Sequence, residues 1–181
     1  SCIITKGGPV AVGRNNGAKI SKGEILLFID SDVILPEHFL TNSLKEFKER
    51  KLDIAGFWLT TLSQKHIDQL AHTIFNIWII LVQHIVAHTA TATMATKRIH
   101  EIIGGYNEKI LFLEDIDYSM RAAKMGKYGC IRQKCFTSAR RYEKDGRFTY
   151  IKYALAEIYM FLFGPIKSNI FNYKFNHYKD N

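Results

Sequence analysis

"EILLFIDSDVILPEHFLTNSLKEFKER", residues 24–50, contains the change of pattern that decides the fold class. Five consecutive apolar residues, Ile25 to Ile29, are typical of a strand that is fully buried. Pro36 can open a helix, and the residues after it place apolar side chains at helical spacing: Phe39, Leu40, Leu44 and Phe47. The stretch therefore predicts a buried strand, an acidic turn and an amphipathic helix.

The alternation of strands and helices continues along the rest of the chain. Strand composition recurs at residues 53–62, 89–99 and 127–142, and helical spacing recurs at 66–86, 114–126 and 148–163. The stretch 10–23, rich in Gly, Asn and Lys, is expected to be a loop. No repeat or linker interrupts the pattern, so we expect one α/β domain over residues 1–181, with a mixed sheet flanked by helices.

The charge of the chain indicates which classes of partner it binds, and its cysteines indicate the redox state of its compartment. The formal net charge of +8 favours anionic partners such as phosphates, nucleic acid or acidic lipids. Cys2, Cys130 and Cys135 form no CxxC pair, which predicts reduced structural thiols. The first residues do not resemble a secretory signal, and the longest apolar run, Ile77 to Val82, is too short to span a bilayer. A cytoplasmic protein is the expectation.

Asp30 and Asp32 follow the predicted strand directly, at the edge where open α/β sheets bind ligands. Two carboxylates separated by one residue repel each other, and a divalent cation relieves that repulsion. A metal site for a diphosphate is one interpretation of the pair. The other is a turn and helix cap before Pro36.

A second acidic group, Glu114, Asp115 and Asp117, lies at a predicted helix start, where the helix dipole stabilises anions. Capping alone explains this position, although a carboxylate there can also act as a general base on a sugar hydroxyl. Arg140 and Arg141 belong to a basic cluster that either binds a diphosphate or is solvated surface charge.

Two further patterns carry little information by themselves. Arg14 and Asn15 lie in the glycine-rich stretch, but neither a P-loop nor a dinucleotide fingerprint is present. His84 and His88 have a spacing that suits zinc on a helix, yet further ligands are not evident. We therefore expect these two histidines to be ordinary core or surface residues.

Taken in order, these segments resemble the family 2 glycosyltransferases, which have the GT-A fold. "GPVAVGRNNGAKISKGEILLFIDSDV", residues 8–33, is similar to the stretch that leads into the family's DxD motif. "IIGGYNEKILFLEDIDYSMRAAKMG", residues 102–126, is similar to its GG-aromatic-x-E turn and ED motif, and "SARRYEKDGR", residues 138–147, to a downstream basic segment.

The resemblance implies a GT-A-like (Rossmann-like) fold and an inverting transferase that uses a nucleotide-sugar donor. It implies that Asp32 and Asp30 hold Mn²⁺ or Mg²⁺ on the donor diphosphate, and that Asp115 is the catalytic base, with Glu114 beside it in the ED motif. Donor-binding residues by resemblance are Arg14, Asn15, Asp30, Arg140 and Arg141.

The resemblance also implies that the family's first strands, with a P-x-[YF]-N-like loop and a D-D-x-S strand end, are absent, which makes the domain N-terminally incomplete. A non-catalytic binding or interaction module is therefore the alternative function. The strand-end carboxylates argue against a nucleic-acid partner. The expected acceptor is a sugar or lipid-linked acceptor. The apolar helix 67–86 and the aromatic helix 148–163 favour an acceptor carried on lipid, or peripheral contact of the protein with a cytosolic membrane face.

Overall fold

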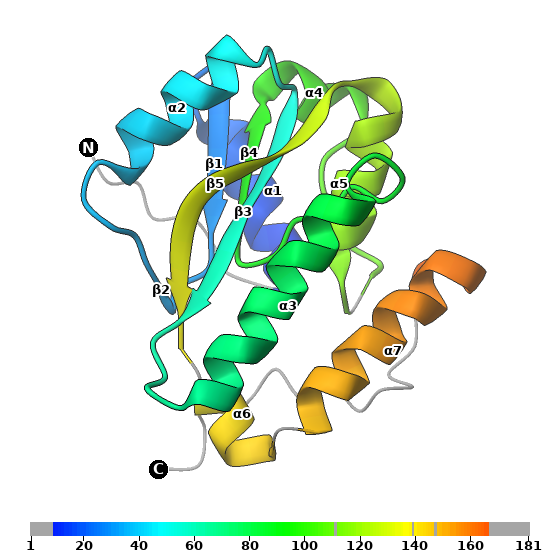
Figure 1. The fold of residues 1–181 in the computed structure, drawn as a ribbon. Coiled ribbons are helices and arrows are strands. Elements are labelled where there is room, and N and C mark those ends of the chain that lie inside the picture. The colour runs from blue at the N-terminus through cyan, green and yellow to red at the C-terminus, as the bar shows by residue number, and fades with distance from the viewer. Residues whose placement is uncertain (1–8, 111, 139, 147, 167–181) are drawn as a thin grey trace.

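The computed structural model describes residues 9–110, 112–138, 140–146 and 148–166, and within them the chain forms a five-stranded sheet flanked by helices (Figure 1). In chain order the elements are α1 (Val10–Ile20), β1 (Ile25–Ile29), β2 (Val33–Ile34), α2 (Phe39–Glu49), β3 (Ile54–Thr61), α3 (His66–Val82), β4 (Ala92–Thr96), α4 (Lys97–Ile102), α5 (Glu114–Met125), β5 (Tyr128–Thr137), α6 (Arg140–Asp145) and α7 (Phe148–Phe163). The α/β class predicted from the sequence is confirmed.

The sheet is mixed, with strand order β1-β4-β3-β5-β2. β3 and β5 are parallel, whereas β4 pairs antiparallel with both β1 and β3, and β2 pairs antiparallel with β5. The parallel pair shifts register between Phe57 and Trp58, which marks an irregularity where β5 has extra residues.

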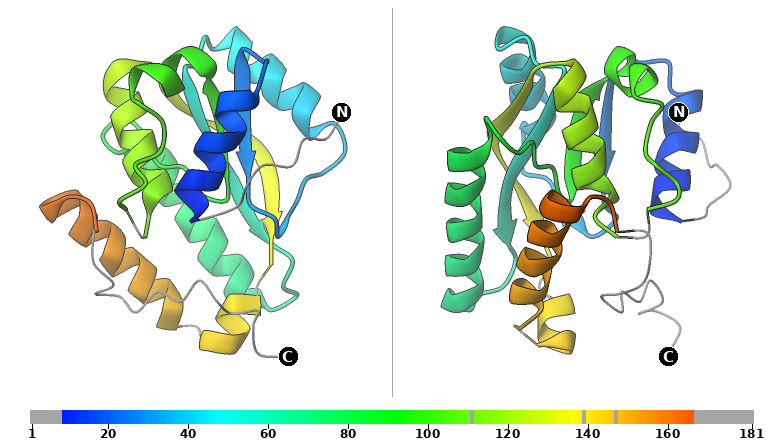
Figure 2. Two further views of the ribbon diagram at one scale, coloured as in Figure 1. Left: turned by 180° about the vertical axis from the view of Figure 1, so that it is seen from behind. Right: turned by 90° about the vertical axis from the view of Figure 1, so that its right-hand side faces the viewer.

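Each face of the sheet has its own apolar core, because neighbouring strand residues point to opposite faces. On one face Phe39 and Phe47 of α2 pack against Ala55 and Met94. On the other face α1, α4 and α5 pack through a second cluster: Ala11, Ile54, Ala95, Ile99, Tyr106, Tyr118 and Ala122. Figure 2 shows α1 and α5 from behind the sheet. The second core therefore holds α1, which carries Arg14 and Asn15, and α5, which begins with Glu114 and Asp115.

β1 differs from its prediction, because it is not fully buried. Only Leu26 among its five residues is buried, and Ile29 is exposed. Within the described residues β1 is an edge strand, with β4 on one side, so no strand covers the backbone groups along its other side. An apolar run of five cannot distinguish an edge from a central strand, because both are rich in the same residues.

One predicted loop and two helix boundaries also differ from the sequence predictions. The expected loop at 10–23 contains the helix α1, whose buried Ala11 and Ala18 pack on the core. α2 begins at Phe39 rather than at Pro36, and α3 ends at Val82 rather than at residue 86. α7, by contrast, occupies the predicted range 148–163.

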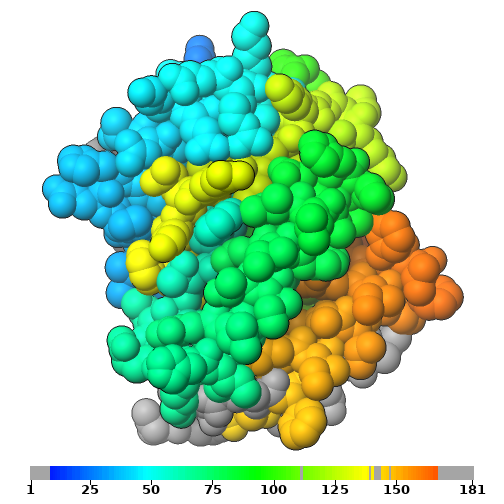
Figure 3. Space-filling model, in the orientation of Figure 1, coloured from blue at the N-terminus to red at the C-terminus, as the bar shows by residue number. Residues whose placement is uncertain are grey.

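Two long apolar helices stand beside each other on the lower part of the molecule. α7 lies next to α3, and the ring of Tyr150 meets that of His72 edge-on at 6.0 Å between centroids (Figures 1 and 3). Within the described part of the chain, no helix combines the length and the apolar composition that crossing a bilayer requires. Cys130 and Cys135 are buried free thiols, as predicted, while Cys2 lies outside the described residues.

Candidate active site

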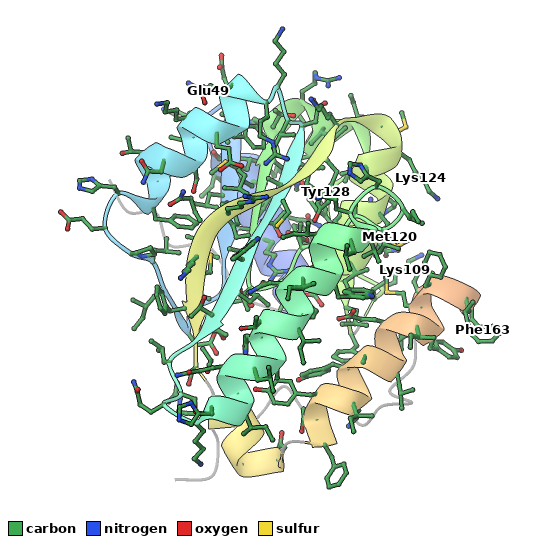
Figure 4. All side chains as sticks on the ribbon, viewed as in Figure 1. Glu49, Lys109, Met120, Lys124, Tyr128 and Phe163 are labelled. Carbon is green, nitrogen blue, oxygen red and sulfur yellow. The ribbon has the colours of Figure 1, made fainter. Side chains whose placement is uncertain are left out.

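A large cleft, about 1710 Å³ in volume, runs along α1 and β1 and continues past the start of α5 into the space between α3 and α7. Its lining has a polar end and an apolar part. The charged residues of the polar end are Arg14, Asp30, Asp32, Glu114 and Asp115. Met120 of α5, labelled in Figure 4, also contributes to the lining. The structure therefore brings the two predicted acidic groups into one cleft.

Arg14 connects the two acidic groups. Its Nη2 donates to Oδ1 of Asp30 at 2.7 Å, and its Nη1 donates to Oε1 of Glu114 at 2.9 Å. The guanidinium also lies over the ring of Tyr106, 4.9 Å from the centroid. The side chains of Arg14 and Glu114 are 13% and 15% exposed, so their charge-assisted bond is shielded from water, whereas the Asp30 side chain is 37% exposed. Arg14 thereby fixes the end of β1 relative to the start of α5.

Asp30 and Asp32 lie in the turn after β1, at the rim of the cleft. The Asp30 backbone N–H donates to the carbonyl of Thr91 at 2.9 Å, which ties the turn to the segment that leads into β4. Asp32 is exposed. Among the described residues no group of three or more His, Cys, Asp or Glu side chains forms a complete metal site. Two carboxylates nevertheless suit Mg²⁺ or Mn²⁺, which take one or two protein carboxylates together with substrate phosphates and water.

Asp115 lies in the first turn of α5, on the floor of the cleft. Leu113, in the left-handed conformation at φ 59°, turns the chain into this helix. Burial raises the pKa of Asp115 to about 7, and the charge of Glu114 adds to the effect, whereas Arg14 and His88 oppose it. A carboxyl group with this pKa exchanges a proton near neutral pH, which is the property that a general base needs.

The side chain of Asn15 does not line the cleft but holds a loop. Its amide donates to the carbonyl of Tyr106 and to Glu108 Oε1, both at 2.9 Å, and its Oδ1 accepts from the Tyr106 N–H at 2.8 Å. These bonds fasten the Gly104–Gly105 turn to α1. The donor-binding role expected for Asn15 stays a prediction, and the contacts observed are structural.

Replacing Gly105 tests this loop attachment. Gly105 has φ +73°, and a Cβ there would lie 2.6 Å from Asn15 Oδ1. Gly105→Ala should lower the free energy of unfolding by more than the roughly 1–2 kcal/mol of left-handed strain alone, because Asn15 must also move. Gly104→Ala is the matched control, since Gly104 has the same φ with nothing within 4 Å of its Cβ. Equal losses for the two variants in urea unfolding would contradict the Asn15 contact.

The basic segment is placed differently from the acidic groups. Arg140 begins α6, is exposed, and donates from Nε to Ser138 Oγ at 3.2 Å. It is not among the residues that line the cleft, although Ser138 is. The side chain of Arg141 lies outside the described part of the structure. Their diphosphate-binding role remains a prediction from the resemblance.

The sequence did not predict the pair of His88 and Glu157 on the floor of the cleft. His88, in the segment between α3 and β4, is buried, and its Nε2 lies 3.2 Å from Glu157 Oε1 of α7. Burial opposes protonation of His88, but Glu157 and Asp115 outweigh it, so its pKa is raised. The only sequence signal was the spacing of His84 and His88, which is misleading because α3 ends before both and His84 is exposed.

Glu157→Gln should lower the pKa of His88, because the amide removes the negative charge that stabilises the imidazolium. The raised pKa means that the pair contributes stability below the ordinary histidine pKa near 6.5, and that this contribution is lost as the pH rises through the folded-state value. NMR titration of the imidazole nitrogens measures the shift. His72, whose pKa is lowered by burial, is the internal control and should be unchanged. An unaltered His88 titration would contradict the pairing.

Known proteins resemble this chain both in sequence and in fold. The sequence profile described as "Glycosyl transferase family 2" matches residues 4–107. The crystal structure of S. aureus TarS 1–349 resembles this chain with a TM-score of 0.56 and 17% identity, over 84% of this chain and 45% of that one. TarS 1–349 in complex with UDP-GlcNAc gives 0.53 and 17%, over 70% and 38%.

The similarity to TarS concerns the fold. At 17% identity the TarS comparison shows the fold, and the chain spans less than half the length of that protein. No curated protein sequence matches this chain significantly. The mixed sheet and its flanking helices are thus those of a GT-A fold.

Proposed function

This chain belongs to glycosyl transferase family 2, and from that membership we propose that it transfers a sugar from a nucleotide-sugar donor to an acceptor hydroxyl, in a metal-dependent, inverting reaction. The observation that carries the proposal is the meeting of Asp30, Asp32, Glu114 and Asp115 in one cleft, with Arg14 bonded between the two groups. TarS binds UDP-GlcNAc, which supports a nucleotide-sugar donor here.

In the proposed reaction Asp115 takes the proton from the acceptor hydroxyl. The hydroxyl oxygen attacks the anomeric carbon, and the bond between that carbon and the donor's diphosphate oxygen breaks on the opposite side. The pKa near 7 supports this role, because the carboxylate form is populated at neutral pH and still binds a proton well.

Asp30 and Asp32 would hold Mn²⁺ or Mg²⁺, which supplies positive charge to the leaving diphosphate. Arg14 supports the site by positioning Asp30 and Glu114, since both of its terminal nitrogens are committed to these carboxylates. Asp32 is the freer of the two acidic residues after β1, as it is exposed and no ion pair to it occurs among the described residues.

The proposed transferase domain has an apolar helix at its surface. We take residues 1–181 as one GT-A-like domain with α7 as an apolar element at its surface. Apolar side chains exposed on α3 and α7, such as Leu70, Leu81, Leu155 and Phe163, support peripheral contact with a cytosolic membrane face. Figure 4 shows Phe163 at the far end of α7.

Calorimetric titration with nucleoside diphosphates, with and without Mn²⁺, tests the proposal. Binding of at least one nucleotide, tightened by Mn²⁺, is the expected result, because the metal would bridge the diphosphate to the acidic pair. If no nucleoside diphosphate binds under either condition, the alternative of a non-catalytic binding module is favoured.

A further inference from the structure

The apolar part of the cleft lies between two helices. Its walls are side chains of α3, of the turn after it and of α7, and we name it the apolar arm: Ile74, Trp78, Ile85, Ile151, Ile158 and Phe161. Each of these side chains is exposed, although each lines the cleft. α3 and α7 therefore present apolar surface toward a shared space that their own packing does not fill.

The apolar arm offers little to a polar ligand. Among the described residues that line it, the acidic and basic side chains are His72, His88 and Glu157, and Tyr150 and Tyr153 of α7 add two hydroxyl groups. His88 and Glu157 bond to each other, and burial lowers the pKa of His72, whose Nδ1 lies 2.8 Å from the Asp68 carbonyl. A sugar in the arm would exchange its hydration for these few polar groups, whereas a hydrocarbon chain gains free energy by leaving water for the apolar walls.

The apolar arm lies next to Asp115, which indicates which substrate would extend into it. The arm meets the polar end at the floor of the cleft, where Asp115 and the His88–Glu157 pair are neighbours that influence each other's charge. If Asp115 receives the acceptor's proton, the acceptor hydroxyl lies beside it, and Asp30 and Asp32 take the donor side. The remainder of the acceptor then extends into the arm. The cleft of about 1710 Å³ is continuous from the acidic residues to the arm, so one ligand can contact both parts.

We propose that the apolar arm binds the hydrocarbon chain of an amphiphilic acceptor, whose hydroxyl-bearing head lies next to Asp115. This inference rests on the proposed function for the placement of the head, but the binding of the chain does not depend on donor or metal. The occupant is a single alkyl or isoprenoid chain, held by the side chains of both helices, rather than the surface of a bilayer or a second copy of this protein.

Tryptophan fluorescence gives a direct test, because the chain has two tryptophans and only Trp78 lines the arm. Trp58 lines a separate pocket with Arg50 and Arg132. In Trp58→Phe, an alkyl glucoside with bromine at the end of its chain, used below its micelle concentration, should quench Trp78 saturably. Lengthening the chain should tighten binding roughly three- to fourfold per methylene. In Trp78→Phe, the remaining Trp58 should not be quenched.

Two substitutions on α7 separate the arm from a general apolar surface. Ile158 and Leu155 are 54% and 56% exposed on the same helix, but only Ile158 lines the cleft. Ile158→Glu should weaken binding of the brominated glucoside at least tenfold, while Leu155→Glu should leave it unchanged. Far-ultraviolet circular dichroism checks that both variants keep their helices.

Three results would overturn the proposal: no saturable quenching of Trp78, equal weakening by the two α7 variants, or quenching that varies with protein concentration as self-association does. Equal weakening would indicate adsorption to an extended apolar face, as at a membrane. Nucleotide titration distinguishes failure of this proposal from failure of the proposed function. Saturable quenching without nucleotide binding would indicate a module that binds hydrocarbon chains but is not a transferase. Nucleotide binding without quenching would indicate a transferase whose acceptor lacks a hydrocarbon chain.

Discussion

Asp115→Asn should reduce the turnover of a nucleotide-sugar donor by on the order of 10²–10⁴, the usual effect of removing a general base. The amide has nearly the same shape as the carboxylate but cannot take a proton, so donor affinity should stay close to that of the unchanged protein. In the unchanged protein, turnover should rise with pH through about 7 and then level off, because the carboxylate form is the active one. Steady-state kinetics across this pH range measure both effects.

Stability provides a second readout for the same variant. The folded-state pKa of Asp115, about 7, lies above its ordinary value of 3.8, so the group's contribution to stability is full below pH 3.8 and is lost as the pH rises through 7. An asparagine side chain never ionises, and the Asp115→Asn variant should therefore melt at a higher temperature than the unchanged protein above pH 7, with little difference near pH 4.

A cap at the start of α5 makes the opposite forecast for Asp115. Asn caps a helix about as well as Asp, so near-normal turnover together with a slightly lower melting temperature would show that Asp115 only starts the helix. The raised pKa of His88 gives a further check, because it depends in part on Asp115 and should fall in the variant. The catalytic assignment requires the loss of turnover and the gain in stability together.

Asp32→Asn should abolish the Mn²⁺-dependent part of nucleoside diphosphate binding. A neutral amide cannot balance a divalent cation that also contacts two phosphates, whereas the exposed position of Asp32 leaves the fold untouched. Asp30→Asn should weaken binding less, although it also breaks the bond from Arg14. Calorimetric titration at several Mn²⁺ concentrations separates the metal-dependent from the metal-independent affinity.

Glu49→Gln is the matched control for the loss of one negative charge. Glu49 is exposed at the end of α2, on the opposite side of the molecule from α7 (Figure 4), and it does not line the cleft. Its removal changes the net charge by the same amount as Asp32→Asn. If both variants keep their manganese dependence, Asp32 is not a metal ligand, and if both lose it, the effect is one of overall charge.

The sequence by itself determined the elements whose residues carry a local signal. The spacing of apolar residues in α7, the acidic start of α5 and the apolar run of β1 each predicted an element that the structure contains. The order of the motifs also predicted the family and the α/β class. These features follow from periodicity and from turn residues, which act between neighbours in the chain.

Tertiary contacts decided the features that local patterns leave undetermined. α1 is a helix in spite of Gly13 and Gly17, because packing of its alanines and the bonds of Asn15 outweigh a poor intrinsic propensity. Among the described strands β1 lies at the edge of the sheet beside β4, a position that its own residues do not specify.

The arrangement of the site likewise depended on the three-dimensional structure. Arg14 joins Asp30 and Glu114, which are 16 and 100 residues away from it, and His88 meets Glu157 across 69 residues. Sequence spacing carries no information about such pairs, because they form only when separate elements pack together. The same packing shields Asp115 from water and raises its pKa. From the sequence alone, Asp115 could be a helix cap or a general base, and the raised pKa that favours a base depends on burial, which the local sequence does not encode.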